Sequence, residues 1–477
     1  MFEKRFFYFY AQKYINLSLI RIYCICKNII SMVYFNRFDL PHPLYKSFKS
    51  FFLNKKGLLL AILVSLNITT QASTSQIPTQ TASHIHTVQV YKKGWNMSYP
   101  IINLYPQEQL TLEFDDFAYD SKNYQYSIVH CTSDWEPSGL MQTEYIDGFM
   151  PNAVEDYAYS FNTTFDYIHY TLDFPNDDIK LKVSGNYLIK IFELGYEDEP
   201  ILVRPFYVSE QAVSIIPRIK YTGNANYRAS MQELNFSIQH PNFRIDNPRD
   251  EVKVVLQQNG RWDNRIDDLK PLFIRHQELD YSYNHENLFD GGNEYRWLDI
   301  RSTRFAPEHV ANIEFFDPHY HFTLFPDNLR GKKPYFYRED FNGKYYIEVK
   351  EYPDATIEAD YAYVHFKLPL QAPLVDGDLY VVGGLSNWLL NDNNRMRYNL
   401  NTHTYETTLL LKQGFYNYQY LFLENNTTRA EVERFEGNYG QTENDYIIYV
   451  YYKSFSDNYE RLIGVNISNS LKHSIKQ

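Results

Sequence analysis

The chain is long enough for several domains and is acidic. Its 477 residues are 44% hydrophobic and 17% aromatic, which excludes a disordered chain; at about 100 to 200 residues per domain, it can hold roughly two to four domains. The formal net charge is -12, and the body of the chain has no Lys/Arg cluster interleaved with aromatic residues, which argues against a nucleic-acid surface.

The N-terminal region has the pattern of an export signal. Two lysines precede the apolar run 57–66, and small polar residues follow it. A membrane span needs about 20 apolar residues, so we interpret 55–73 as a secretory signal peptide; the alternative is an apolar helix near a core. Residues 1–54 are then an N-terminal extension, and Met32 is a more natural start.

Cysteine usage argues against a disulfide within the exported chain. Cys24 and Cys26 fall in the extension, which leaves Cys131 as the only thiol once the signal is removed. The fold must therefore be stabilised by packing rather than by cross-links.

From about residue 88 onward, apolar and polar residues alternate in short runs, for example in 124–128, 168–174 and 417–422. A period of two predicts half-buried antiparallel strands. Turn residues separate the runs every ~8 to 15 residues, as in β-sandwiches. Because no long helix-period segment is present, we expect an all-β fold of three consecutive immunoglobulin-like or early-set β-sandwich domains.

Proline-bearing segments mark the expected boundaries between these domains. A last strand at 203–208 is followed by a new run at 215–217, and 368–373 carries two prolines before the next strand. The expected domains are 88–213, 214–369 and 370–465, followed by a loose polar tail at 466–477.

The stretch from His130 to Ser138 holds imidazole, thiol, hydroxyl and carboxylate groups. Alternation sends His130 and Cys131 to opposite faces of one strand, so they cannot act together as nucleophile and base. A thiol enzyme built on Cys131 would need a histidine from elsewhere, such as His169. We interpret Cys131 as a buried, inert thiol and Trp135 as the anchor of a turn.

Two segments have the residue types of metal sites without the full pattern. Asp317, His319 and His321 would share one strand face, which suits zinc or iron, but no fourth ligand is indicated. The acidic runs 177–178 and 197–199 lack the spaced oxygen ligands of a calcium loop. We expect structural roles for both, and therefore no metal and no cofactor. No catalytic motif is present, so the prediction is that the chain is not an enzyme.

The segment from Gly383 to Trp388, followed by the strand 414–420, resembles the early-set sandwich of glycogen-binding modules. In those modules an exposed tryptophan stacks on sugar rings, and Trp388 is at the matching position. The polar partners of the later glucan-binding loop are not recognisable in 436–441. A carbohydrate-binding module on an exported protein is therefore the alternative function, with Trp388 as its stacking residue.

Several short motifs follow one another along the chain, at 130–135, 144–149, 160–163, 169–170, 174–177, 184–187, 296–300, 340–343, 359–362, 436–438 and 442–446. This ordered series resembles the type IX secretion system plug proteins of Bacteroidetes. The resemblance covers about residues 88 to 465. It is specific because many motifs occur in the same order.

The resemblance implies a non-enzymatic, periplasmic protein that is associated with the outer membrane through a protein partner. That partner is the type IX translocon barrel, whose periplasmic end the protein would close, and no small-molecule substrate is expected. Aromatic residues are plausible contacts because they are enriched in protein interfaces. The possible interface residues, each of which is alternatively a core residue, are Trp135, Tyr145, Phe149 and Trp297.

Overall fold

The computed structural model describes residues 79–473, except 268 and 283–284. The expected extension 1–54, the signal peptide 55–73, the start at Met32 and the residues Cys24 and Cys26 lie outside the described residues. Among the residues that are described, no helix has the length and apolar character needed to cross a membrane.

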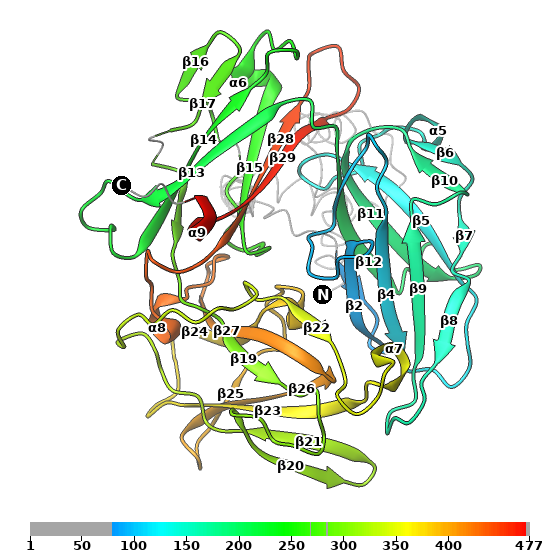
Figure 1. Cartoon of the computed structure of the whole chain (residues 1–477), viewed down its shortest axis with the longest axis vertical. Helices are drawn as coiled ribbons and strands as arrows, with labels where there is room; N and C mark the ends of the chain where they lie inside the picture. The colour runs from blue at the N-terminus through cyan, green and yellow to red at the C-terminus, as the bar shows by residue number, and fades with distance from the viewer. Residues whose placement is uncertain (1–78, 268, 283–284, 474–477) are drawn as a thin grey trace, which may run out of the picture. The chain divides into compact units, whose positions relative to one another are not determined.

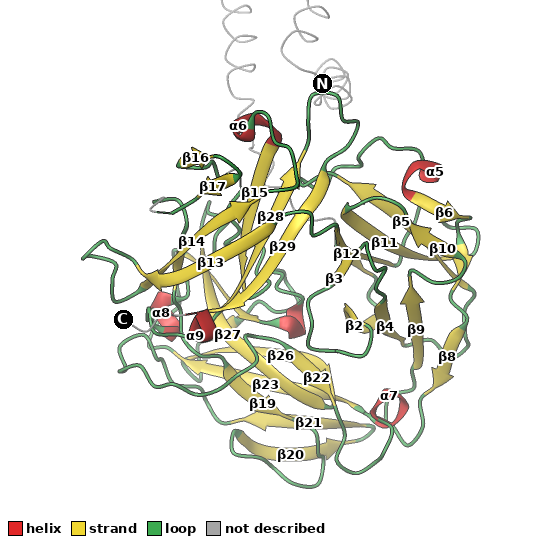
Figure 2. Cartoon of the chain, turned by 45° about the horizontal axis from the view of Figure 1, so that its top comes forward, coloured by secondary structure: helices red, strands yellow, loops and turns green. Residues whose placement is uncertain are grey.

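Strands dominate the described chain, which confirms the all-β prediction (Figure 1). The helices are single turns within or beside loops (Figure 2). They are α5 Gln142–Tyr145, α6 Pro248–Glu251, α7 Ala355–Glu358, α8 Glu433–Glu436, α9 Ser470–His473 and the 3-10 turn η1 Gly384–Ser386. The hydrophobic cores are therefore built between sheets.

The first sandwich packs two sheets around one core, on the right of Figure 1. One sheet has the order β1-β12-β11-β5-β7, with β3 added parallel to β12, and the other has the order β2-β4-β9-β8. The bounds are β1 Gln80–Thr81, β2 Ile85–Lys92, β3 Ile101–Asn103, β4 Leu110–Asp116, β5 Tyr124–Cys131, β7 Asn152–Ala153, β8 Asp156–Tyr159, β9 Ile168–Phe174, β11 Gly185–Glu193 and β12 Leu202–Ser209. A separate pair joins β6 Ile146–Gly148 to β10 Ile179–Leu181. Alternate residues of β4 and β5, such as Phe114 and Tyr126, fill the core between the sheets.

The middle sandwich combines strands that are far apart in the sequence. One sheet has the order β13-β14-β17-β16, with β18 also paired to β14, and the facing sheet has the order β15-β28-β29. The bounds are β13 Ser214–Tyr221, β14 Met231–Gln239, β15 Val252–Gln258, β16 Phe273–Arg275, β17 Glu278–Asp280, β18 Leu288–Asp290, β28 Asp445–Tyr452 and β29 Arg461–Asn469. Its core joins Leu234, Val254 and Ile448.

The third sandwich lies at the bottom of Figure 1. Its sheets have the orders β19-β27-β22, with β24 also paired to β27, and β20-β21-β23-β26-β25. The bounds are β19 Arg296–Asp299, β20 Val310–Phe316, β21 His319–Leu324, β22 Tyr345–Ile347, β23 Tyr361–Pro369, β24 Gly377–Val382, β25 Arg397–Asn399, β26 Thr404–Lys412 and β27 Gly414–Glu424. Tyr416, Tyr418 and Tyr420 of β27 point into its core, opposite Val364 and Phe366 of β23.

Strand pairing does not follow the expected boundary between residues 369 and 370. Strand β23 lies before that boundary and pairs with β26 after it, while β28 returns to pair with β15. The expected tail also differs, because β29 continues to Asn469 along β28 and α9 follows. These pairings form because a strand is stabilised by any neighbour that satisfies its backbone, however distant in sequence.

Candidate functional site

A buried charge cluster joins the first and third sandwiches. Asp115 lies opposite His169 in the β4–β9 pair, and Tyr361 lies opposite Lys412 in the β23–β26 pair. The two pairs meet at Asp115, whose carboxylate accepts hydrogen bonds from His169 Nδ1 at 2.6 Å, Tyr361 Oη at 2.6 Å and Lys412 Nζ at 2.7 Å. Asp115 and Lys412 are 0% and 1% exposed. The cluster therefore fixes one sandwich against the other.

The neighbours of Asp115 and Lys412 favour the ionised form of the Asp115 carboxylate. Burial would raise the pKa of Asp115, but Lys412 and His169 outweigh that effect and hold the pKa below its usual range. Burial lowers the pKa of Lys412, and Asp115 opposes the shift. Lys412 also donates to Thr356 O at 2.9 Å and lies 4.1 Å from the centre of the Tyr167 ring. Each charge is thus compensated by several neighbours, which is what a buried ion pair requires.

A second buried network lies within the third sandwich, behind Trp297. Arg296 donates to both oxygens of Glu436, at 2.9 and 3.0 Å, and to Asp327 at 2.7 Å. Tyr418 and Tyr420 each donate to Asp327 at 2.7 Å. Glu436 and Asp327 are both buried, and despite that burial the arginine holds the pKa of each carboxyl below its usual range. The network fixes β19 and so aims the next side chain, Trp297, to the opposite face.

Trp297 lies on the outward face of the β19-β27-β22 sheet, where Arg338 stacks on its ring. The Arg338 guanidinium is 3.7 Å from the centre of the indole, and Phe415 packs edge-on, with 5.4 Å between the ring centres. The centre of the Phe341 ring lies 5.8 Å from that of Phe415 and 5.9 Å from that of Tyr346, so the aromatic packing continues along the sheet. The predicted interface residue Trp297 is thus half-buried by side chains of its own chain.

The other predicted interface residues divide between core and surface. Trp135 is 3% exposed and packs edge-on against Tyr207 at 5.2 Å and Trp262 at 6.2 Å, so it joins the first and middle sandwiches. Tyr145 is 8% exposed and donates to Ile128 O at 3.1 Å. Neither is available to a partner on this surface, because each is buried by its own chain, whereas Phe149 is 87% exposed.

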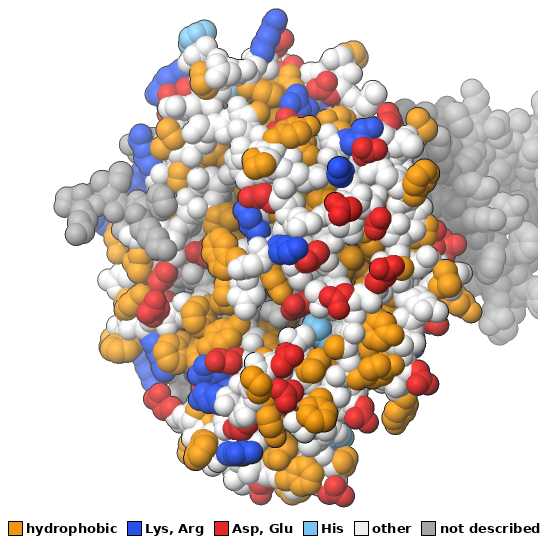
Figure 3. Space-filling model, turned by 45° about the vertical axis from the view of Figure 1, so that its right-hand side comes forward, with side chains coloured by type: hydrophobic (Ala, Val, Ile, Leu, Met, Phe, Trp, Pro, Cys, Tyr) orange, Lys and Arg blue, Asp and Glu red, His pale blue; other side chains and the backbone are white. Residues whose placement is uncertain are grey.

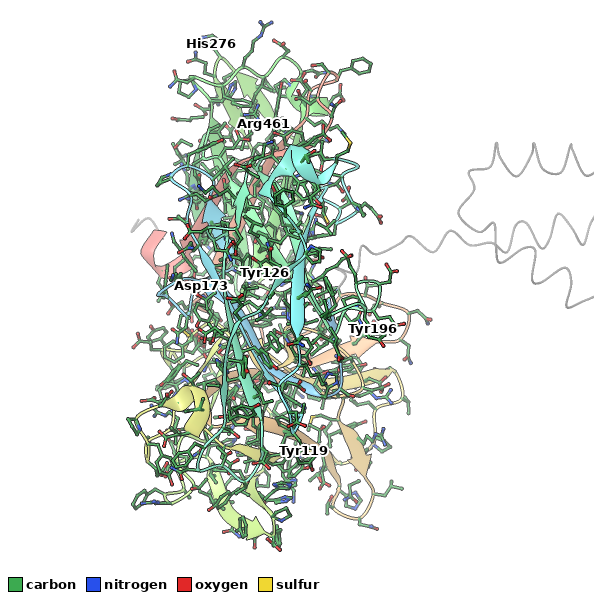
Figure 4. The ribbon with its side chains drawn as sticks, turned by 90° about the vertical axis from the view of Figure 1, so that its right-hand side faces the viewer. Tyr119, Tyr126, Asp173, Tyr196, His276 and Arg461 are labelled. Atoms are coloured by element: carbon green, nitrogen blue, oxygen red, sulfur yellow. The ribbon has the colours of Figure 1, made fainter. Side chains whose placement is uncertain are left out.

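Further exposed aromatic residues surround the first sandwich. Tyr119 and Tyr196 are exposed on its loops (Figure 4), as are Tyr157 and Tyr159 on the edge strand β8. Figure 3 shows that hydrophobic side chains on this side are interspersed with acidic and basic ones. The face turned forward in that view therefore carries no large patch of charge of one sign.

Cys131 has neither the exposure nor a neighbouring histidine base that a catalytic thiol needs. Cys131 is 1% exposed, its Sγ faces Val129 O at 3.8 Å, and burial raises its pKa to about 12. His130 points into the other face of β5, where burial lowers its pKa to about 4 and Ser184 O lies 3.1 Å from Nε2. His169, the histidine considered as a partner, contacts Asp115 instead. A thiol with so high a pKa stays protonated at neutral pH and is a poor nucleophile.

The two candidate metal-binding histidines contact aromatic and imidazole rings. His319 stacks on Phe165 at 3.7 Å, and His321 Nδ1 lies 2.9 Å from His365 Nε2. No cluster of three or more His, Cys, Asp or Glu side chains suited to a metal occurs within the described residues.

Trp388 lines a cleft where the three sandwiches meet. The cleft has a volume of ≈ 180 Å³, and its aromatic lining includes Tyr99, Trp262 and Tyr345. Lys344 also lines it, and its ammonium group lies 3.9 Å from the centre of the Tyr99 ring. One edge of the Trp388 indole packs over Gly343, where an added Cβ would be 2.0 Å from Cη2. An aromatic-lined cleft with a few polar groups suits a small ring-shaped ligand or an inserted side chain.

The carboxyl groups of Glu294 and of Asp340, in the loop 325–344, both have raised pKa values. Burial raises the pKa of Glu294 to about 7, and Tyr335 donates a hydrogen bond to it. Burial raises the pKa of Asp340 to about 8, with repulsion from Glu294 and Glu443 adding to it. Asp340 accepts hydrogen bonds from the backbone N–H groups of Tyr295 and Asn342 and so ties the loop to β19.

Sequence reasoning missed the buried cluster and Arg338. Asp115 and Lys412 are 297 positions apart, and no local pattern relates them. Arg338 follows Phe336 and Tyr337 in a loop, where only the basic and aromatic composition could have indicated a surface role.

Comparisons with known proteins agree with this architecture. The family model described as type 9 secretion system plug protein 1st domain matches residues 85–210. A crystal structure of a hypothetical protein from Parabacteroides merdae at 2.30 Å resolution is similar, with a TM-score of 0.80 and 38% sequence identity over 82% of this chain and 98% of that chain. No curated protein matches the chain. The structural likeness extends well beyond the segment matched by the family model.

Proposed function

This chain belongs to the type 9 secretion system plug family, and we propose that it is a non-enzymatic plug of the secretion channel. In this proposal it is exported to the periplasm, binds the outer-membrane translocon barrel and closes the periplasmic end of that barrel. The observation that carries the proposal is the family match over the first sandwich.

The construction of the chain supports this role. A plug must keep its shape while it blocks a wide opening, and junctions fixed by buried charges resist bending. The Asp115–Lys412 pair links the first and third sandwiches, and Trp135 links the first and middle ones. The titratable groups that could serve chemistry, such as Cys131 and His130, are buried and held in their neutral forms.

The test is a deletion and complementation experiment in the native host. Loss of the gene should leave the barrel in the outer membrane but make cells more permeable to large antibiotics that normally cannot cross it. Complementation with the wild-type chain should restore the barrier, and the tagged chain should co-purify with the barrel. Unchanged permeability together with no barrel in the eluate would reject the proposal.

A carbohydrate-binding module remains the second candidate because of one observation. Trp388 and Trp262 line the same cleft together with polar side chains, and aromatic faces with polar neighbours can hold sugar rings. Calorimetric titration of oligosaccharides and envelope polysaccharide against the wild-type chain and Trp388→Ala tests this function. Saturable heat that is lost in the variant supports it, and no heat with either protein rejects it.

A further inference from the structure

The cleft that Trp388 lines, the Trp388 cleft, carries cations and no anion in its walls. Its charged lining residues are Arg204 of β12 and Lys344, and no aspartate or glutamate is among the described residues that line it. Lys344 has a counter-ion, because its Nζ lies 3.3 Å from Oδ2 of Asp445, which is not a lining residue. Arg204 is therefore the charge that the cleft leaves to be explained.

Arg204 is a buried guanidinium without a carboxylate partner. It is 5% exposed, and its Nη1 donates to the carbonyl oxygens of Gln80 and Val203 at 2.9 Å each, while its Nη2 donates to Thr81 Oγ1 at 2.8 Å. All three acceptors are neutral, and Nε has no hydrogen-bond partner among the described residues. Burial lowers the pKa of Arg204 only to about 10, so the guanidinium stays charged at neutral pH.

Two other arginines of the chain show the partner that Arg204 lacks. Arg261 donates from Nε and Nη2 to the two oxygens of Asp263, at 3.0 and 2.7 Å. Arg301 donates from the same two nitrogens to Asp299, at 2.9 and 2.8 Å. A carboxylate matches the planar fork of a guanidinium, and a buried charge without one is costly. A carboxylate is therefore the group that Arg204 would gain most from binding.

The adjoining sequence does not supply this carboxylate. Thr79, the first described residue, lines the cleft, and residues 55–78 before it contain no aspartate or glutamate. The segment that leads into the cleft therefore offers Arg204 no internal counter-ion.

The size and the walls of the cleft suit a ring. Its volume is ≈ 180 Å³, and a cavity of about 150 Å³ is enough to hold one benzene molecule. Trp262, Tyr345 and Trp388 contribute aromatic side chains to the walls, and Asn96 and Asn387 contribute amide groups that can bond a polar substituent. One six-membered ring with a short substituent therefore matches the available space.

We propose that the Trp388 cleft binds a six-membered ring that bears a carboxylate, with the carboxylate paired to Arg204 and the ring against the aromatic walls. Aromatic carboxylic acids and uronic acids share this chemistry, and both are anions at neutral pH. The site goes beyond the plug function and does not depend on it. It also differs from the expectation, drawn from the family resemblance, that the chain takes no small molecule.

The test is isothermal titration calorimetry of the exported chain, starting at Ser73, with matched pairs of ligands. Benzoate is compared with benzamide, and glucuronate with glucose, so each acid has a neutral partner with the same ring. The variant is Arg204→Met, and the control is Arg301→Met, because Arg301 is half-buried and does not line the cleft. Quenching of tryptophan fluorescence gives a second readout, since Trp262 and Trp388 line the cleft.

The proposal predicts that at least one acid binds at a single site and that its neutral partner binds about tenfold more weakly or worse. Arg204→Met should weaken binding of that acid about tenfold or more, while Arg301→Met should change it less than about threefold. Binding of benzoate alone identifies an aromatic acid, binding of glucuronate alone identifies a uronic acid, and binding of both supports the shared chemistry.

The ligand comparison uses the wild-type chain, so it decides the matter even if Arg204→Met does not fold. Absence of saturable heat with both acids, or equal affinity for an acid and its neutral partner, would overturn the inference and leave the plug function untouched. Equal binding of an acid by folded Arg204→Met and by the wild-type chain would also overturn it.

Discussion

Lys412 donates a hydrogen bond to Asp115 across 2.7 Å, and both side chains are buried where the first sandwich meets the third. Burying two charges costs several kcal/mol in lost hydration, which close pairing and further hydrogen bonds must offset. Here the carboxylate has three donors and the ammonium group has a carbonyl and an aromatic face. The junction therefore depends on every member being present.

Removing one partner of this pair should be costly. Lys412→Met leaves Asp115 buried without its cation, and we expect a loss of about 3 to 5 kcal/mol in the free energy of unfolding. The double variant Asp115→Leu/Lys412→Met should recover part of that loss, because no uncompensated charge remains. Urea unfolding of the wild-type chain, the single variants Lys412→Met and Asp115→Leu, and the double variant measures the coupling. Additive effects would show that the two residues do not act together.

The contributions of Glu294 and Asp340 to the free energy of unfolding should fall between about pH 5 and pH 8. Burial raises the pKa of Glu294 to about 7 and of Asp340 to about 8, so the folded state holds these protons more tightly than the unfolded state. The stabilisation is complete at acidic pH and is lost as the pH rises through these values. For a shift of this size, Glu294 contributes about 3 kcal/mol.

The variant Glu294→Gln tests this dependence, because a neutral amide cannot ionise. Its stability should vary less with pH between 5 and 8 than that of the wild-type chain, as followed by urea midpoints at several pH values. The control is Glu339→Gln, at the exposed position next to Asp340, which should keep the wild-type dependence of stability on pH. The same pH profile for Glu294→Gln and the wild-type chain would contradict the assignment.

Cys131 should resist modification in the folded chain. Its thiol is buried, and burial raises its pKa to about 12, so little thiolate is present at pH 8. In a chain that starts at Ser73, a thiol reagent such as Ellman's reagent should react slowly before unfolding and stoichiometrically in guanidinium chloride. Rapid labelling of the native protein would indicate an accessible, activated thiol and reopen the enzyme hypothesis.

Gly343 and Gly195 allow backbone strain to be separated from crowding. Both have a positive φ, +82° and +88°, but an added Cβ would meet Trp388 at Gly343 and nothing within 4 Å beyond its chain neighbours at Gly195. Gly195→Ala should cost about 1 kcal/mol from its backbone alone, whereas Gly343→Ala must also displace the indole, for about 3 kcal/mol in total. Tryptophan fluorescence should change only for Gly343→Ala. Equal stabilities and spectra would show that Trp388 is not held over Gly343.

Local patterns predicted the strands, and non-local contacts decided their partners. Alternation in 124–131 placed Tyr126 and His130 on one face and Cys131 on the other, as observed in β5, because the period of two belongs to a single strand. Nothing in the same pattern indicates that β28 returns to β15, since any strand can supply the backbone groups that another one needs.

The interface residues show the same limit. Sequence reasoning selected tryptophans as anchors, but exposure depends on what the rest of the chain packs against each ring. Trp135 is buried against Tyr207 and Trp262, while Trp297 is half-buried between Arg338 and Phe415. Arg338, which covers Trp297, comes from a loop whose path depends on distant partners such as Glu436 and Glu443.

The most direct test of the plug function is co-purification from the native host. The chain would carry a C-terminal affinity tag at its own locus, and the outer membrane would be solubilised gently before capture and mass spectrometry. Recovery of the translocon barrel in near-stoichiometric amount is the predicted result. Recovery of glycans or envelope polysaccharide without the barrel would contradict the plug function and direct attention to the Trp388 cleft.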